Sequence, residues 1–214
     1  MAGSLRVPGH TPVSAEERSS ESFARYRSGQ KNVFDIPISV DTFKSSVAES
    51  AIQAGADLVN DIWGLKYDSE MGAVIAKYDV ACCLMHNKSN TEYNNFSLIC
   101  FLRHRNVSIL QDRPALKMKK SCLIRELVGK TFEMNLETMN HLELFKNLGF
   151  PVLLGTSRKS MIGLALDLPV DQRVEGTLAT SVIGVMKGCS FVRVHDVKEN
   201  RRVIQMTEAI LGCN

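Results

Sequence analysis

The chain has 214 residues, 44% of them hydrophobic, and a formal net charge of +3 at pH 7. This length and apolar content predict one domain with a buried core, spanning residues 1–214. No apolar run is long enough to span a membrane, and the first residues lack the apolar block of a secretion signal. We therefore expect a cytoplasmic protein without a membrane partner.

The basic residues are concentrated in one stretch of the chain. Residues 97–128 contain seven Lys or Arg against two acidic residues, so the remainder is slightly acidic. A protein built around nucleic acid carries its positive charge more widely, so no nucleic-acid partner is expected. The six cysteines show no Cys-x-x-Cys spacing, and Cys82 and Cys83 lie in an apolar run. We expect reduced thiols without a catalytic role.

In chain order, residues 1–32 are polar and poorly patterned, whereas regular elements begin at Pro37. Apolar runs predict strands, and periodic apolar spacing predicts helices between them. The predicted strands are 37–40, 57–59, 80–85, 152–154 and 190–194, with a weak candidate at 122–124. The predicted helices are 45–54, 71–78, 136–148, 174–187 and 203–211. Residues 97–128 otherwise show no sustained period, and they and residues 1–32 are atypical parts of the predicted domain.

Short strands that alternate with helices favour parallel pairing. Polar residues follow the end of each predicted strand, namely Asp41, Asn60-Asp61, His86, Thr156 to Ser160 and His195-Asp196. In a βα-repeat barrel the carboxyl ends of the strands gather at one face, where ligands bind. The sequence therefore predicts a shared site in a TIM-type (β/α) barrel that is incomplete at the N-terminus and irregular in the middle.

The residue types at these strand ends suit a flat, anionic ligand. Asp41 can accept hydrogen bonds from a ring or stabilise a developing cation, and the Asn60 amide suits a heterocycle edge. Local sequence leaves helix capping equally open for both residues. Arg193 and His195 lie two apart in a predicted strand, so both would face one ligand such as a diphosphate. A structural ion pair remains the alternative for Arg193. No spacing indicates a metal site formed by the protein alone.

These motifs together resemble dihydropteroate synthase, a pterin-binding family of the folate pathway. The matching segments, in order, are Ile38-Ser39-Val40-Asp41-Thr42, Gly55 to Ile62, Leu84-Met85-His86, Gly155-Thr156-Ser157-Arg158-Lys159-Ser160 and Arg193-Val194-His195-Asp196-Val197. Residues 9–17 add a further match, and Ser4-Leu5-Arg6-Val7-Pro8-Gly9 resembles the family's Ser-Thr-Arg-Pro-Gly loop.

The resemblance implies a TIM barrel that condenses 4-aminobenzoate with 6-hydroxymethyl-7,8-dihydropterin diphosphate and releases pyrophosphate. Asp41 and Lys159 would be catalytic residues, and both would contact the pterin together with Asn60 and Met85. The implied 4-aminobenzoate contacts are Arg6, Ser157 and Ser160. Arg193 and His195 would hold the diphosphate. The family also implies Mg²⁺ and a homodimer.

Two family segments have no counterpart in this sequence. The strand ending in Asn-x-Thr-Pro-Asp-Ser-Phe-Ser, whose Asn reaches the metal-bound diphosphate, is absent, and residues 125–130 lack the family's pterin-binding Asp. We hypothesise that residues 18–32 and 97–128 are frame-shifted translations, which predicts impaired activity. Two alternative functions remain open: a non-catalytic pterin-binding remnant and a related pterin-binding methyltransferase.

Overall fold

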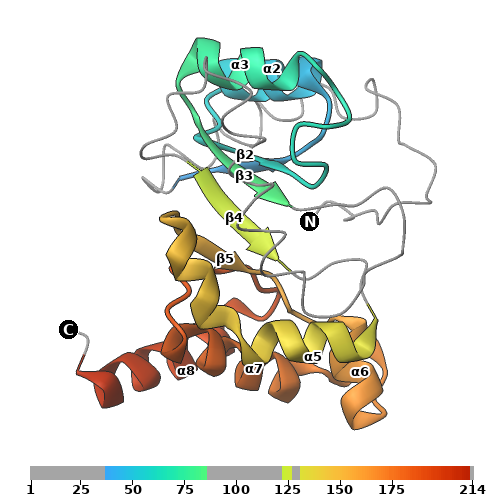
Figure 1. Cartoon of the computed structure of the whole chain (residues 1–214), viewed down its shortest axis with the longest axis vertical. Helices are drawn as coiled ribbons and strands as arrows, with labels where there is room; N and C mark the ends of the chain where they lie inside the picture. Colours follow the sequence, from blue (N-terminus) through green and yellow to red (C-terminus); the bar gives the residue numbers. More distant parts are fainter. Residues whose placement is uncertain (1–36, 86–121, 127–130, 213–214) are drawn as a thin grey trace. The chain divides into compact units, whose positions relative to one another are not determined.

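The structure, a computed structural model, describes residues 37–85, 122–126 and 131–212 (Figure 1). The described residues belong to two compact units, one containing residues 37–85 and 122–123 and the other residues 124–126 and 131–212. Within these ranges no helix is both long enough and apolar enough to span a bilayer. The predictions for residues 1–32 and 97–121 lie outside the described part of the chain, as does His86.

The first unit is a parallel sheet with a helix after each of its first two strands. Strands β1 (Ser39–Asp41), β2 (Leu58–Asp61) and β3 (Ala81–Met85) pair in chain order. Helices α2 (Ser45–Gln53) and α3 (Met71–Tyr78) connect them and lie side by side, as the blue and green ribbons of Figure 1 show. The predicted parallel strands and intervening helices are confirmed here, with ends that shift by one or two residues.

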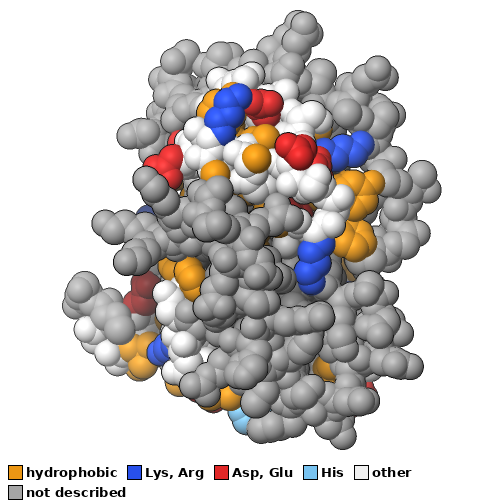
Figure 2. Space-filling view, turned by 45° about the horizontal axis from the view of Figure 1, so that its top comes forward, with side chains coloured by type: hydrophobic (Ala, Val, Ile, Leu, Met, Phe, Trp, Pro, Cys, Tyr) orange, Lys and Arg blue, Asp and Glu red, His pale blue; other side chains and the backbone are white. Residues whose placement is uncertain are grey.

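Both helices bury the apolar face that their periodicity predicts. In α2 this face is Ala48, Ala51 and Ile52, and in α3 it includes Val74 and Ile75. Residues spaced three and four apart lie on one side of a helix, so these side chains pack together in the core. The outer surface is polar: Lys77 Nζ lies 2.8 Å from Glu49 Oε1, and Figure 2 shows basic and acidic side chains near one another, which on this unit are Lys, Asp and Glu.

The second unit repeats the alternation of parallel strands and helices. Its elements are β4 (Cys122–Glu126, of which residues 124–126 belong here), α5 (Phe132–Asn140), the 3₁₀ helix η2 (Leu142–Leu148), β5 (Val152–Leu154), α6 (Ser160–Leu166), the 3₁₀ helix η3 (Val170–Gln172), α7 (Val174–Met186), β6 (Phe191–Val192) and α8 (Val197–Leu211). Strand β5 pairs in parallel with both β4 and β6. The weak strand candidate at 122–124 is therefore confirmed, and the α/β class holds in both units.

The predicted helix 136–148 is two helices with a break. Helix α5 begins earlier because the Thr131 hydroxyl accepts a hydrogen bond from Met134 N at 3.3 Å, a side-chain cap that the periodicity did not reveal. At His141 the chain tightens into η2, which ends at Gly149 with φ +75°. The predicted inner residues Met139, Leu142 and Phe145 are nevertheless all buried.

The most deeply buried face of α7 differs from the one that its apolar spacing predicts. That spacing favours Leu178, Val182, Val185 and Met186 inside, but the first three are only half-buried and Met186 is 61% exposed, whereas the fully buried residues are small and mostly polar. The buried residues are Thr177, Thr180, Ser181 and Gly184. Their hydroxyls are satisfied locally or by neighbouring elements, so burial costs little. An added Cβ at Gly184 would lie 2.6 Å from Leu154 Cδ2, which shows how closely α7 packs on β5.

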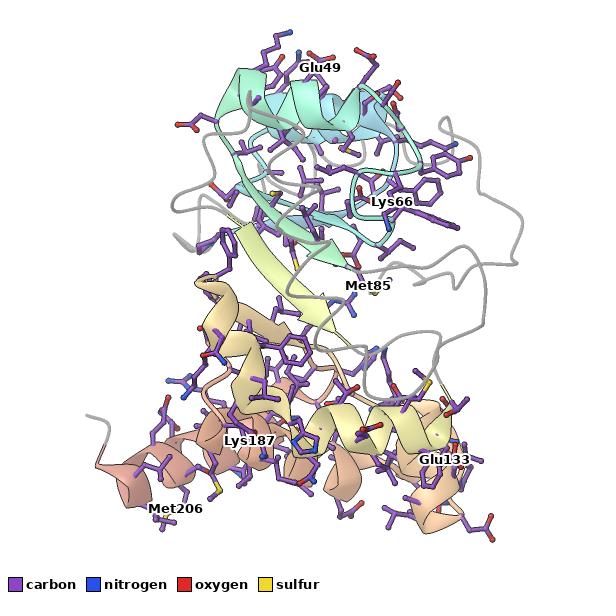
Figure 3. The ribbon with its side chains drawn as sticks, viewed as in Figure 1. Glu49, Lys66, Met85, Glu133, Lys187 and Met206 are labelled. Atoms are coloured by element: carbon purple, nitrogen blue, oxygen red, sulfur yellow. The ribbon has the colours of Figure 1, made fainter. Side chains whose placement is uncertain are left out.

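The end of the chain also differs from its prediction. Strand β6 stops at Val192, so Arg193 and His195 follow the strand and do not share a strand face as expected. Helix α8 starts at Val197, six residues before the predicted start, and Figure 3 shows Met206 pointing away from it. The described thiols Cys82, Cys83 and Cys189 are free, as predicted, and burial raises the pKa of Cys189 to about 11.

Candidate active site

Asp41 and Asn60 lie side by side at the ends of neighbouring strands. They are partners in the β1–β2 register, and the Asn60 amide nitrogen donates a hydrogen bond to Asp41 Oδ1. Neither residue caps a helix, because the residues preceding α2 and α3 are Lys44 and Glu70. The capping alternative is therefore excluded for both. The start of α2 is instead held by Asp68, whose carboxylate accepts from Ser45 N at 2.7 Å.

The Asn60 side chain is buried but not fully satisfied within the described residues. Its exposed fraction is 3%, and its Oδ1 atom has no hydrogen-bond partner among them. A buried acceptor without a partner costs about 1–3 kcal/mol. Asn60 thus offers an acceptor, and Asp41 a carboxylate, at one strand edge. This pair can recognise a ring that carries both N–H donors and acceptors.

Asp61, next to Asn60, has a structural role. Its two carboxylate oxygens accept hydrogen bonds from Trp63 N at 2.8 Å and Leu65 N at 2.7 Å. Burial raises the pKa of this carboxyl, although the two backbone hydrogen bonds oppose that effect. The loop needs this support because Leu65 has φ +65°, a conformation unfavourable for a non-glycine residue. Asp61 therefore fixes the loop that follows Asn60.

Met85 occupies the end of β3, where Figure 3 labels it. Its side chain is 3% exposed, as expected for a residue that packs and does not hydrogen-bond. Its carbonyl oxygen lies so close to Gly64 that an added Cβ there would be 2.6 Å away. Gly64 also has φ +58°. Only glycine allows the loop after β2 to approach the end of β3 this closely.

In the second unit, the Ser157 hydroxyl joins the loops after β5 and β6. Ser157 Oγ accepts a hydrogen bond from His195 N at 3.1 Å and lies 2.9 Å from His195 Nδ1. The hydroxyl keeps its own proton and a second lone pair, so it can either donate to Nδ1 or accept from it. In the imidazole form that carries its proton on Nε2, the hydroxyl donates to Nδ1 and Nε2 serves as a donor.

Burial and the charges around His195 disfavour the charged form of its ring. Burial lowers the pKa of His195 from its ordinary 6.5, and the cations Arg158 and Arg193 lower it further, whereas Asp196 opposes them. Arg193 is thus close enough to act on the ring electrostatically. The two residues predicted to face one ligand do lie together, although they follow the strand. Arg193 and His195 thus form a cationic and hydrogen-bonding group.

Arg158 is engaged within the protein. Its guanidinium donates to both Asp196 oxygens, from Nε at 3.1 Å and from Nη2 at 2.5 Å. This bidentate pairing lowers the pKa of Asp196 and ties the loop after β5 to the start of α8. The sequence motifs contain both residues, but nothing in their spacing indicated that they pair. A separation of 38 positions is invisible to local patterns.

Helix α7 holds the same loop from the other side. The hydroxyls of Thr156 and Thr180 lie 2.8 Å apart, and Thr177 Oγ1 accepts from Arg158 N at 3.1 Å. Ser160 is exposed at the start of α6, and Lys159 precedes it. The structure therefore brings Ser157, Arg193 and His195 together in this unit, and Lys159 lies two residues after Ser157 in the same loop. Arg6 lies outside the described residues.

The described residues do not supply a metal site. No group of three or more His, Cys, Asp or Glu within them is arranged to hold a metal ion. The groups after β5 and β6 are mainly cationic or neutral donors, which suit phosphate oxygens. Magnesium needs oxygen ligands such as carboxylates and waters. The donors that the described residues present after β5 and β6 therefore do not fit the implied Mg²⁺.

Comparison with known proteins identifies the relatives of this chain. A family described as pterin binding enzyme matches residues 3–100 and 122–195. A dihydropteroate synthase from Clostridium beijerinckii is 50% identical over 222 residues, covering 99% of this chain and 79% of that protein. One from Bacillus subtilis is 43% identical and covers 99% of this chain and 74% of that protein.

A solved structure gives the same result. Dihydropteroate synthase from Thermus thermophilus in complex with 4-aminobenzoate has a TM-score of 0.80 at 32% identity, covering 94% of this chain and 79% of that one. The internal stretch between the two matched ranges, residues 101–121, falls inside the atypical segment 97–128, and residues 196–214 also lie outside the match.

Proposed function

The chain belongs to the dihydropteroate synthases, a group of the pterin-binding enzymes, and from this premise we infer which residues bind which part of the substrates. It is a transferase that condenses 4-aminobenzoate with 6-hydroxymethyl-7,8-dihydropterin diphosphate and releases pyrophosphate in folate biosynthesis. We propose that its strands and helices form a TIM-type (β/α) barrel. The alternation of parallel strands with helices in both units supports this fold.

Asp41 and Asn60 bind the pterin ring. The observation that carries this assignment is the buried Asn60 amide, hydrogen-bonded to Asp41 and left with an acceptor that has no partner within the described residues. A pterin edge presents N–H donors and a carbonyl or ring-nitrogen acceptor, which complement this pair. Met85 packs against the ring as an apolar neighbour. Asp41 also stabilises the positive charge that develops on the pterin methylene when the carbon–oxygen bond breaks.

Arg193 and His195 bind the diphosphate. Arg193 supplies a permanent cation, and the neutral His195 supplies its Nε2–H, since Ser157 occupies Nδ1. These donors stabilise the charge that gathers on the departing pyrophosphate oxygen. The amine of 4-aminobenzoate then forms the new carbon–nitrogen bond and loses a proton.

Lys159 contacts the pterin and the 4-aminobenzoate, with Ser157, Ser160 and Arg6 on the aminobenzoate side. Ser157 lies beside the aminobenzoate without bonding it through the hydroxyl, because the hydroxyl is hydrogen-bonded to His195. Ser160 is exposed and able to donate a hydrogen bond to a carboxylate. Lys159 adds a cation to the same side, as the carboxylate of 4-aminobenzoate requires.

A homodimer and a cytoplasmic location complete the proposal. Exposed apolar side chains on α7 and α8 support self-association: Ile183 is 39% exposed, Met186 61%, Met206 61% and Ile210 72%. Light scattering of the purified chain should give twice the chain mass, and a charged residue at Ile210 should shift it toward one chain mass. Cell fractionation tests the location.

A turnover assay on the purified chain tests the function. Incubation with both substrates should yield dihydropteroate, detected by mass spectrometry, and pyrophosphate, detected as phosphate after cleavage by an added pyrophosphatase. The Asn60→Ala variant should lose most of this turnover, whereas the exposed Arg201→Gln variant on α8 should keep it. Binding of the pterin diphosphate without product would favour the non-catalytic remnant. Methyl transfer to or from a pterin would favour the methyltransferase.

A further inference from the structure

The loop after β5 adopts a conformation that needs support from outside itself. Arg158 has φ +55°, in the left-handed region that non-glycine residues avoid. Such a backbone persists only where the surrounding structure holds it in place. Its two neighbours, Ser157 and Lys159, are assigned to the substrates above. The position of these side chains therefore depends on whatever fixes the peptide groups around residue 158.

Arg173, the residue just before α7, donates hydrogen bonds to backbone carbonyl groups of this loop. Its Nη1 donates to Arg158 O at 3.2 Å and to Lys159 O at 3.3 Å, and its Nε donates to Leu168 O at 2.9 Å. One rigid guanidinium thus links the loop after β5 to the segment that follows α6. A planar fork of donors can make these bonds together, whereas a lysine cannot.

The first turn of α7 also holds the N–H side of the same residue. Thr177 Oγ1 accepts from Arg158 N at 3.1 Å and donates to Arg173 O at 2.9 Å. Thr177 is fully buried. Arg158 is therefore bonded at its N–H by Thr177 and at its carbonyl by Arg173. Arg173 and Thr177 are four residues apart in the chain, and the Thr177 hydroxyl is hydrogen-bonded to the Arg173 carbonyl.

Helix α6 leaves room for this guanidinium. A Cβ added at Gly163 would overlap the Nη2, Cζ and Nε atoms of Arg173. The guanidinium therefore lies against the backbone of α6, the helix that begins directly after Lys159. The Arg173 guanidinium fills the space that a side chain at position 163 would need.

We propose that Arg173 is a positioning residue for the transferase reaction: it fixes the backbone of Arg158 and Lys159 and thereby directs the Lys159 side chain at the substrates. This inference rests on the assignment of Lys159 made above. Arg173 itself need not touch a substrate. Small displacements of a catalytic group reduce the rate strongly. Loss of the Arg173 hydrogen bonds to the Arg158 and Lys159 carbonyls, which we call the Arg173 clamp, should therefore lower kcat more than it changes KM.

Kinetics of Arg173→Gln and Arg173→Lys in the full chain test the proposal. We expect Arg173→Gln to lower kcat at least tenfold with KM for both substrates changed less than threefold, and Arg173→Lys to fall between it and the unmodified chain. Ser181→Ala is the matched control, because it removes the buried 2.7 Å hydrogen bond to Asn200 elsewhere on α7. It should lower the thermal midpoint and leave kcat unchanged at temperatures well below unfolding.

The outcomes separate this inference from the function itself. An unmodified chain that turns over, with Arg173→Gln variants of equal kcat, would overturn the positioning role alone. An unmodified chain without turnover would instead reject the proposed function.

The shared space between residues 163 and 173 provides a second test. Gly163→Ala should lower the thermal midpoint when Arg173 is present and lower it much less in the Arg173→Gln background. Equal shifts in both backgrounds would contradict the packing of the guanidinium on α6 and, with it, the clamp.

Discussion

The Ser157 hydroxyl connects two loops that carry different parts of the site. It accepts from the backbone of His195 and lies 2.9 Å from the ring nitrogen Nδ1. The sequence placed Ser157 near the aminobenzoate and His195 on the diphosphate, as separate contributions. Their hydrogen bonds make them dependent on each other, because the hydroxyl selects the ring nitrogen that faces the ligand.

Replacing Ser157 by Ala should weaken the binding of pyrophosphate. The ring of His195 would lose the partner of its Nδ1 atom and could rotate or change its protonated nitrogen. A lost hydrogen bond of this kind is worth about 1 kcal/mol, so we expect the Kd of pyrophosphate to rise about fivefold in calorimetry. Ser160→Ala, at an exposed position, is the control and should leave that Kd unchanged. An unchanged Kd in Ser157→Ala would show that the hydroxyl does not orient the ring.

His195 should make stability depend on pH in one direction. Its pKa in the folded protein lies below 6.5, because burial and the cations Arg158 and Arg193 disfavour the charged ring. The stability gained from the neutral ring is therefore complete above pH 6.5 and is lost as the pH falls through the lower folded pKa. Thermal midpoints between pH 7.5 and 5 should fall more for the unmodified chain than for His195→Asn. An equal fall of the thermal midpoint in both proteins would contradict the lowered pKa of His195.

Local sequence indicated the chemistry of several site residues but not their partners. Asp41 and Asn60 were expected together because each ends a parallel strand, and the register confirms that they are neighbours. The bond between Arg158 and Asp196 and the support from Thr177 could not be predicted, because both join positions far apart in the chain. Arg173 belongs to none of the sequence motifs. Its guanidinium donates to backbone carbonyl groups, which every residue has, so no partner could be identified from residue types.

At the level of elements, the predictions succeeded where apolar residues alone determine burial. Helix α3 and strand β5 were predicted to the residue, because each is a compact apolar run with clear boundaries. The bounds of helix α7 were predicted to within one residue, but its most buried face was not, because that face is made of Thr, Ser and Gly and the apolar residues point to another side. Helix α6 was missed since it is only seven residues long and follows a polar loop.

The close contact of α7 with β5 predicts that Gly184 tolerates no larger residue. A Cβ there would lie 2.6 Å from Cδ2 of Leu154, which is 2% exposed and has little space to move. Gly184→Ala should therefore reduce the free energy of unfolding by about 1–3 kcal/mol, measured by urea denaturation. Ala179→Ser, on the exposed side of the same helix, should change it by less than about 0.5 kcal/mol. Equal stability of both variants would disprove the tight contact.

For the whole molecule, the relatives establish the family, and the structure describes two units of the chain separately. The prediction that residues 18–32 and 97–128 are frame-shifted remains a prediction: the family model matches residues 18–32, 97–100 and 122–128 and leaves residues 101–121 inside the second segment unmatched. Resequencing the locus tests it directly. An intact reading frame that encodes the same residues would reject the hypothesis.

The central claim is that Asn60 binds the pterin ring and Arg193 the diphosphate of one substrate. Calorimetric titration of the unmodified chain, Asn60→Ala and Arg193→Met with two probes, 6-hydroxymethylpterin and inorganic pyrophosphate, tests this claim most directly. We predict that Asn60→Ala weakens only the pterin, and Arg193→Met only pyrophosphate, each about tenfold. Variants that weaken both probes equally, or neither probe, would contradict the account.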